Sequence, residues 1–319
     1  FGKISVFSDL NNLTDLSMDH RYISICGITE KELLDNFKEG ITELSETYGD
    51  TEEATVAKLK ARYDGYHFEE HTIGIYNPFS VLNALSKLRY KDYWFETGTP
   101  TFLVDLLKMH NYHLSDMTKE RVSSDVINSV DTLSTNPIPV IYQSGYLTIK
   151  GYDERFKTYL LGFPNKEVEE GFLNFLLPLY TSAGSESPFM VNEFVQDVEA
   201  GNTEQFMKRL AAFFASNNYQ VAGEAELYFQ NAMYLVFKIM GFYTQVERPT
   251  SDGRIDAIIQ TPNYIYVIEC KLDRTADEAI KQIENNGYAE PFLMDKRKLY
   301  KIGVSFSSET RGVAEYKIK

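Results

Sequence analysis

Apolar positions follow a helical spacing over much of the first two thirds of the chain. The helices that this spacing predicts cover residues 31–47, 78–88, 166–179 and 203–215. Residues 63–68 form a turn-rich aromatic stretch, residues 146–163 read as a hairpin, and residues 181–188 form a polar connection. The region up to about residue 218 is therefore expected to be mostly helical.

A different order of elements follows residue 219. The expected elements are a helix at 224–240, strands at 243–247, 254–260 and 264–272, a helix at 276–285 and a strand at 299–306. Thr275 and Glu278 have capping-box spacing before the second helix, and Asn286-Gly287 provides its stop. This order predicts an α/β domain over residues 219–319, with the strand at 264–272 central in a covered sheet.

Composition indicates a globular protein of more than one domain. The chain has 319 residues, of which 43% are hydrophobic and 24% charged. It contains neither an apolar run long enough to cross a bilayer nor a signal-peptide start, so we expect a cytoplasmic protein without membrane contact. The first residue is Phe1, which we interpret as a fragment of a longer chain. Cys26 and Cys270 are far apart in sequence and predict no disulfide framework.

The acidic charge belongs to the first part of the chain. The net charge of −14 argues at first against nucleic-acid binding, which depends largely on Lys and Arg. Residues 223–319, however, hold 13 Lys and Arg against 14 Asp and Glu, a net of −1, which leaves 19 against 32, a net of −13, upstream. Nucleic acid therefore remains a candidate partner of the last third, and a protein is a candidate partner of the acidic first part.

Three ionisable residues are expected to converge in the last third. A hairpin turning at Pro262-Asn263 places Asp256 opposite Glu269, and side-chain alternation places Lys271 on the same face. Two carboxylates about 5 Å apart in an apolar sheet repel each other unless a cation lies between them. Mg²⁺ is commonly held by one or two carboxylates together with water and phosphate. The alternative is an ion pair that only stabilises the hairpin.

The motif formed by Asp256, twelve further residues and Glu269-Cys270-Lys271 resembles the signature of the PD-(D/E)XK nuclease superfamily. Ile255 stands where the superfamily name has proline. The resemblance implies a restriction-endonuclease-like α-β-β-β-α-β fold with a central mixed sheet. It also implies a Mg²⁺ or Mn²⁺ site formed by Asp256, Glu269 and Glu226, with catalytic assistance from Lys271 and Gln282.

The upstream region resembles the later half of an AAA-ATPase-like domain found before such nuclease modules in uncharacterised bacterial proteins. The phrases that carry this resemblance are FSDLNNL at 7–13, RYDGY at 62–66, YNPFS at 76–80 and TGTPTF at 97–102. The implied domains are residues 1–218 and 219–319. The sequence has no G-x-x-x-x-G-K-[ST] loop, so we expect this chain not to bind ATP.

Two other groups of residues are candidates for a functional site. His67 and His71 are spaced like zinc ligands, but Phe68 replaces the glutamate of a zincin helix, and nearby Gly65 and Gly74 argue against a helix. The basic cluster at 296–298 could contact phosphates or could be a solvated turn before a strand. We expect no zinc site at the histidines and a solvated turn at the basic cluster.

Three hypotheses follow. The first is a Mg²⁺- or Mn²⁺-dependent nuclease acting on DNA, or on RNA as a second choice. The second is a binding module that keeps the nuclease fold without cleaving. The third is an ATP-driven machine whose motor lies mostly outside this chain.

Overall fold

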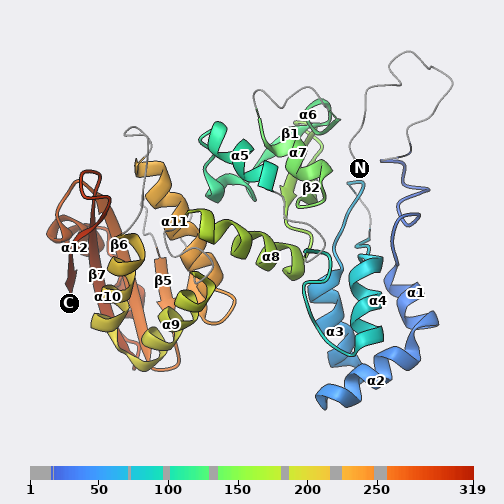
Figure 1. The fold of residues 1–319 in the computed structure, drawn as a ribbon, viewed down its shortest axis with the longest axis horizontal. Coiled ribbons are helices and arrows are strands. Elements are labelled where there is room, and N and C mark those ends of the chain that lie inside the picture. The colour runs from blue at the N-terminus through green and yellow to red at the C-terminus, as the bar shows by residue number, and fades with distance from the viewer. Residues whose placement is uncertain are drawn as a thin grey trace. The chain divides into compact units, whose positions relative to one another are not determined.

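The computed structural model describes residues 16, 18–70, 73–95, 101–128, 136–180, 187–215, 225–247 and 257–319. The chain divides into two compact units, Phe1–Phe172 and Leu173–Lys319. We call them unit 1 and unit 2, and Figure 1 labels most of their elements.

Unit 1 is mainly helical and carries a small sheet. Its helices are α1 (Glu30–Asn36), α2 (Lys38–Tyr48), α3 (Glu52–Tyr63), α4 (Pro78–Lys87), α5 (Thr101–Met109), η3 (Leu114–Asp116), α6 (Ser124–Asn128), α7 (Ile138–Gln143) and the start of α8 (Lys166–Leu176). The strands β1 (Arg121–Ser123), β2 (Thr148–Asp153) and β3 (Thr158–Gly162) form an antiparallel sheet in the order β1-β3-β2. The expected hairpin at 146–163 is confirmed as β2 and β3.

The prediction of a single helix at 31–47 is wrong, because the helix is interrupted at Phe37. Phe37 has φ −123° and ψ 26°, which ends α1 and starts α2 in a new direction. The break allows Leu33 of α1 and Leu44 of α2 to enter the same core, against which Phe37 itself packs. Burial of this apolar surface outweighs the continuous helical pattern.

A short sequence motif fixes the start of α4. The side chain of Asn77 accepts hydrogen bonds from the backbone N–H groups of Phe79 and Ser80, and Pro78 occupies the first turn. Asparagine is a favoured N-cap, and proline at N1 sacrifices no helical hydrogen bond. The expected helix at 78–88 is confirmed as α4.

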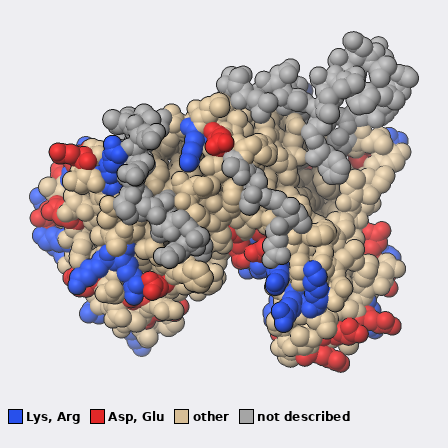
Figure 2. Space-filling view, viewed as in Figure 1, with Lys and Arg blue, Asp and Glu red and all other residues tan. Residues whose placement is uncertain are grey.

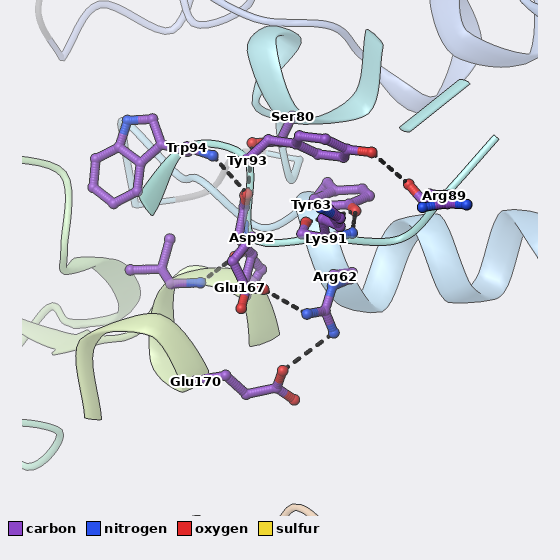
Figure 3. Close-up of polar contacts among 12 residues, drawn as sticks. Arg62, Tyr63, Ser80, Arg89, Lys91, Asp92, Tyr93, Trp94, Glu167 and Glu170 are labelled. Carbon is purple, nitrogen blue, oxygen red and sulfur yellow. Dashed lines mark hydrogen bonds and ion pairs between the residues drawn. The ribbon is translucent and has the colours of Figure 1, made fainter. Parts of the chain in front are cut away.

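A buried polar cluster joins three helices of unit 1 to the loop after α4 (Figure 3). Glu167 of α8 is fully buried, and its Oε1 accepts hydrogen bonds from the Ser80 hydroxyl and the Trp94 backbone N–H, both at 2.9 Å. Arg62 of α3 pairs with Asp92 at 2.5 Å and with Glu170 at 3.2 Å. The cluster therefore fixes α3, α4, α8 and the loop against one another.

Unit 2 contains a five-stranded mixed sheet among its described residues, with helices on both faces. After η5 (Leu177–Leu179), its helices are α9 (Ser187–Ala200), α10 (Thr203–Phe214), α11 (Ala225–Met240), α12 (Ala276–Asn285) and η7 (Glu290–Phe292). Its strands are β4 (Gln245–Glu247), β5 (Ala257–Gln260), β6 (Tyr264–Leu272), β7 (Lys298–Ser307) and β8 (Gly312–Ile318). The predicted order of helix, three strands, helix and strand is confirmed, whereas α9 and β8 were not predicted.

The strand β6 is central, as expected, in the order β4-β5-β6-β7-β8. It pairs antiparallel with β5 and parallel with β7. Val267 and Ile268 point to opposite faces, and both are fully buried. A strand covered on both faces is unsuited to an unpaired charge.

The two faces of the sheet have different covers. On one face, Ile265 and Val267 of β6 pack against Ile280 and Ile283 of α12. On the other face, the Tyr266 hydroxyl donates a 2.6 Å hydrogen bond to the carbonyl of Val198 in α9. Side-chain alternation along β6 therefore places residues 265, 267, 269 and 271 on the face covered by α12.

The helices α9 and α10 belong to unit 2, although the sequence places the domain boundary at residues 218 and 219. Phe306 of β7 contacts Phe214 of α10 and Phe229 of α11, with ring centroids 5.0 and 4.8 Å apart. This aromatic contact joins α10 to the sheet of the compact unit that begins at Leu173. The assignment of residues 1–218 to an ATPase-like region stays a prediction.

A close approach of α12 to β7 fixes the helix beside the sheet. A Cβ atom on Gly303 would lie 2.4 Å from the carbonyl oxygen of Ala276, the first residue of α12. The predicted capping box is present, because Thr275 and Glu278 each accept a hydrogen bond from the backbone N–H of the other. Glu315 of β8 accepts from the Ala276 N–H at 2.6 Å, and Gly287 follows the helix with φ +66°.

Neither a membrane span nor a disulfide is found in the described part of the chain. Over those ranges, no helix combines the length and the apolar character needed to cross a bilayer. Neither Cys26 nor Cys270 is part of a disulfide.

Glu167 predicts a pH dependence of the stability of unit 1. Burial raises the pKa of its carboxyl from 4.5 to about 7, while the Trp94 N–H, the Ser80 hydroxyl and Arg62 oppose the shift and Asp92 adds to it. The folded pKa exceeds the unfolded one, so this contribution is fully present below pH 4.5 and is lost as pH rises through 7. The loss is up to about 3 kcal/mol.

Glu167→Gln should remove this titration. The free energy of unfolding of the variant, minus that of the parent, should therefore rise between pH 4.5 and pH 7 and level off above. Trp94 is the single tryptophan, so its fluorescence during urea unfolding reports on this unit. The exposed Glu154→Gln is the matched control. Parallel pH curves for the parent and Glu167→Gln would show that Glu167 is ionised in the fold.

Gly303→Ala should destabilise unit 2 by about 1–3 kcal/mol, because the new methyl group must push α12 away from the sheet. Gly312→Ala is the matched control, since a Cβ there meets its nearest neighbour at 3.6 Å, an ordinary contact. Urea unfolding followed by far-UV circular dichroism measures both. Equal losses for the two variants would mean that the approach of α12 is not tight.

Candidate functional site

The candidate site lies at the carboxyl end of β6, where Glu269 and Lys271 share the face covered by α12. The Lys271 Nζ lies 2.6 Å from Glu269 Oε1. The Glu269 side chain is 2% exposed and that of Lys271 is 19% exposed. The structure thus brings together these two of the predicted site residues, as a nearly buried ion pair.

The strand segment that carries this pair is buried. Val267 and Ile268 precede Glu269 along β6, and Ala257 lies opposite Ile268 on β5; all three are fully buried. In parallel register with β7, Glu269 stands beside Gly303, and Lys271 stands beside Ser305. The missing side chain at Gly303 lets the first turn of α12 approach beside Glu269. A charge in such a place is weakly screened, and its interaction with a neighbouring charge is correspondingly strong.

The turn between β5 and β6 is held firmly and sets the register. The Thr261 N–H donates to the Tyr264 carbonyl at 2.9 Å, so that Pro262 and Asn263 form the predicted two-residue turn. Arg297 donates to the Thr261 carbonyl at 3.1 Å and to the Gln260 side chain at 2.9 Å. The resulting pairs include Ala257 with Ile268.

The basic cluster at 296–298 contributes to this scaffold. Besides binding the turn, Arg297 pairs with Asp295 at 2.7 Å. The Lys298 Nζ lies 4.6 Å from the centroid of the Tyr300 ring, a cation–π geometry. Two of the three basic side chains therefore have partners within unit 2.

The connection from β6 to α12 is also fixed. The Asp273 carboxylate accepts hydrogen bonds from the Ser308 N–H at 2.8 Å and from its hydroxyl at 2.6 Å. The Ser305 hydroxyl donates to the Arg274 carbonyl at 2.5 Å. Both contacts tie the segment after Lys271 to β7, so the end of β6 cannot shift independently of the sheet.

The other predicted site residues are located as follows. Gln282 is half-buried on α12, the helix that covers the Glu269 face. Residue 226 lies in the first turn of α11, but its side chain is outside the described part of the structure. Asp256 is also outside the described residues. The role of these three residues stays a prediction.

Metal-binding chemistry at this site depends on carboxylates beyond Glu269. Within the described ranges, no group of three or more His, Cys, Asp or Glu residues gathers in a metal-binding arrangement. Glu269 nevertheless supplies the oxygen ligand that Mg²⁺ and Mn²⁺ prefer, in an environment that favours a cation beside it. Among the described residues, the carboxylate of Glu269 thus fits part of a divalent-metal site.

The segment with His67 is not the helix that a zincin-type site requires. Tyr66 makes an isolated antiparallel bridge to Ile75, and Ile28 makes one to Tyr76. The His67 N–H donates to the Thr148 hydroxyl at 2.8 Å. His71 lies outside the described residues.

Sequence reasoning missed two residues that shape the site, Gly303 and Glu315. Gly303 was identifiable, because a glycine within a strand pattern often marks a close backbone approach. Glu315 caps α12 from β8, a strand that was not predicted.

On the face of unit 2 that Figure 2 draws, positive and negative side chains are interspersed. Two ion pairs, Lys317 with Asp277 and Lys319 with Glu284, connect β8 and the residue after it to α12.

Comparisons with known proteins bear on unit 2 most directly. Residues 224–316 match the family model described as the PD-(D/E)XK nuclease superfamily. A protein of Azotobacter chroococcum mcd 1, described as an uncharacterized protein in vnfD 5'region, is 30% identical over 330 residues. That alignment covers all of this chain and 61% of the relative, so the chain spans about three fifths of its length. No solved structure matches. Residues 224–316 therefore form a PD-(D/E)XK nuclease superfamily domain.

Proposed function

We propose that residues 219–319 are a divalent-metal-dependent nuclease that hydrolyses phosphodiester bonds of DNA, with RNA as the second choice. The observation that carries this proposal is the nearly buried Glu269 beside Lys271 on the central strand of a superfamily domain. A nuclease-like activity on nucleic acid accords with that family. Mg²⁺ is the proposed metal, with Mn²⁺ as its substitute.

The register of the hairpin supports a second carboxylate at the site. Ala257 pairs with Ile268. We expect the same register, continued by one residue, to pair Asp256 with Glu269. Residues directly opposite in an antiparallel pair have Cβ atoms about 5 Å apart. Two carboxylates at that distance, next to an apolar sheet, favour a cation between them because their mutual repulsion is poorly screened.

The proposed role of each site residue follows from the chemistry of its side chain. Asp256 and Glu269 hold the metal, and Glu226 completes the carboxylate set. A bound divalent ion supplies an activated water and neutralises charge that builds on the phosphate. Lys271 donates a hydrogen bond and a positive charge to the attacked phosphate, since an ammonium group is a donor and not a ligand. Gln282 assists from α12.

The first 218 residues are proposed to be the later part of an AAA-ATPase-like regulatory region. Its missing phosphate-binding loop is the reason to expect no ATP binding by this chain. Its acidity favours contact with a protein over contact with nucleic acid. A nuclease acting on cellular DNA or RNA would work in the cytoplasm.

The second candidate function is a module that binds nucleic acid or protein without cleaving. The closed ion pair between Lys271 and Glu269 favours it, because a permanent pair would leave the lysine unavailable to a phosphate. Catalysis and simple binding differ in their dependence on Asp256. A cleavage assay with variants therefore distinguishes them.

Asp256→Asn and Glu269→Gln should each reduce Mg²⁺-dependent cleavage to background, because each removes a charge needed to hold the metal. Asp256→Asn should leave the fold intact, as asparagine has nearly the same shape. Cleavage of single-stranded and duplex DNA and of RNA with Mg²⁺, Mn²⁺ or EDTA measures the effect. Asp277→Asn, at an exposed acid on α12, is the control and should cleave like the parent. Parental cleavage by Asp256→Asn would reject the mechanism.

A further inference from the structure

We propose that Lys271 is an internal counter-ion that competes with the divalent cation for Glu269. The inference rests on the proposed metal site and adds a regulatory property to it. Without metal, the ammonium group neutralises the carboxylate. When the metal binds, the ammonium group is displaced and becomes available to a phosphate.

The geometry gives Lys271 the position of a cation. Its Nζ lies 2.6 Å from Glu269 Oε1, a short charge-assisted hydrogen bond. The Glu269 side chain is 2% exposed, so water contributes little to its solvation. Removing the partner of a buried charge is costly, and the pair therefore stabilises the metal-free domain.

A metal ion and the ammonium group repel each other when both lie at this carboxylate. Mg²⁺ binds oxygen ligands at about 2.0–2.1 Å. An ammonium group hydrogen-bonded to the same carboxylate would then lie only a few ångströms from a doubly charged ion. Metal binding therefore weakens the existing pair between Nζ and Oε1.

The stem of Lys271 permits this movement. The side chain is 19% exposed, compared with 2% for Glu269, so its end lies nearer to solvent. Lysine is a flexible chain with three donors, and it can reorient while its backbone stays paired with Ser305 in β7. The displaced ammonium group is then free to bind an anionic phosphate. Metal binding at Glu269 and the availability of the Lys271 ammonium group to a phosphate are thereby coupled on one strand.

A purely structural ion pair makes the opposite prediction. If Lys271 only positions Glu269, its removal would disorder the carboxylate and weaken metal binding or leave it unchanged. If Lys271 competes with the metal, its removal strengthens metal binding. The sign of the change in metal affinity thus separates the two roles without any measurement of cleavage.

The test is isothermal titration calorimetry of the full chain with Mn²⁺, without nucleic acid. Lys271→Met keeps most of the side-chain volume and removes the charge, and it should lower the Kd by about tenfold, or about 1.4 kcal/mol. Its metal-free melting temperature should fall, and its gain in melting temperature with Mn²⁺ should exceed that of the parent. Lys271→Arg, which keeps the charge, should bind Mn²⁺ like the parent.

Controls address net charge and folding. Lys281→Met removes an exposed lysine from α12, and it should leave the Kd within about twofold of the parent, because charges exposed to solvent are well screened. If Lys271→Met does not fold, Lys271→Gln takes its place, since glutamine can still donate to Glu269 without a full charge. It should also bind Mn²⁺ more tightly than the parent.

The outcomes separate this inference from the proposed function. Binding of Mn²⁺ by the parent with equal or weaker binding by Lys271→Met, or by its replacement Lys271→Gln, overturns the counter-ion role and leaves the metal site standing. An equal gain in Lys281→Met also overturns it, because the effect would then be one of net charge. If neither the parent nor the Lys271 variants bind Mn²⁺, both proposals fail together.

Discussion

A carboxylate inside an apolar sheet needs a positive charge close by, and Glu269 meets this requirement through Lys271. The pair lies on a strand with both faces covered, between a hairpin turn held by Arg297 and a helix that approaches β7 at Gly303. Each neighbouring element limits how far the carboxylate can move. The site is thus a charge fixed in place by packing, and its chemistry depends on which cation neutralises it.

Most elements of unit 2 were predicted from the sequence, because the local sequence patterns and the packing favour the same elements. The strand at 264–272 and the helix at 276–285 have the predicted limits, since alternation, a capping box and a glycine stop all point to the same boundaries. The strand β8 was not predicted, because its residues alternate weakly and it pairs at the edge of the sheet. In unit 1, the break at Phe37 depends on a core contributed by other helices, and the local pattern cannot reveal it.

The site was predictable in part. Glu269 and Lys271 were identified from their spacing on one strand, and the structure places their charged groups 2.6 Å apart. An ion pair was one of the two arrangements that the sequence left open, because a sequence pattern shows which residues share a face and not which charges pair with each other. The contribution of Gly303 depends on a helix packed across the sheet, so it required the three-dimensional arrangement. The resemblance of residues 1–218 to an ATPase-like domain stays a prediction.

The most direct test of the proposed metal site is anomalous diffraction from crystals of the full chain soaked in Mn²⁺. Such a site predicts an anomalous peak within bonding distance of a Glu269 carboxylate oxygen, with Asp256 as a second ligand and the Lys271 Nζ moved away from Oε1. Crystals that contain Mn²⁺ elsewhere, or not at all, and that keep the 2.6 Å pair between Lys271 and Glu269 would contradict it.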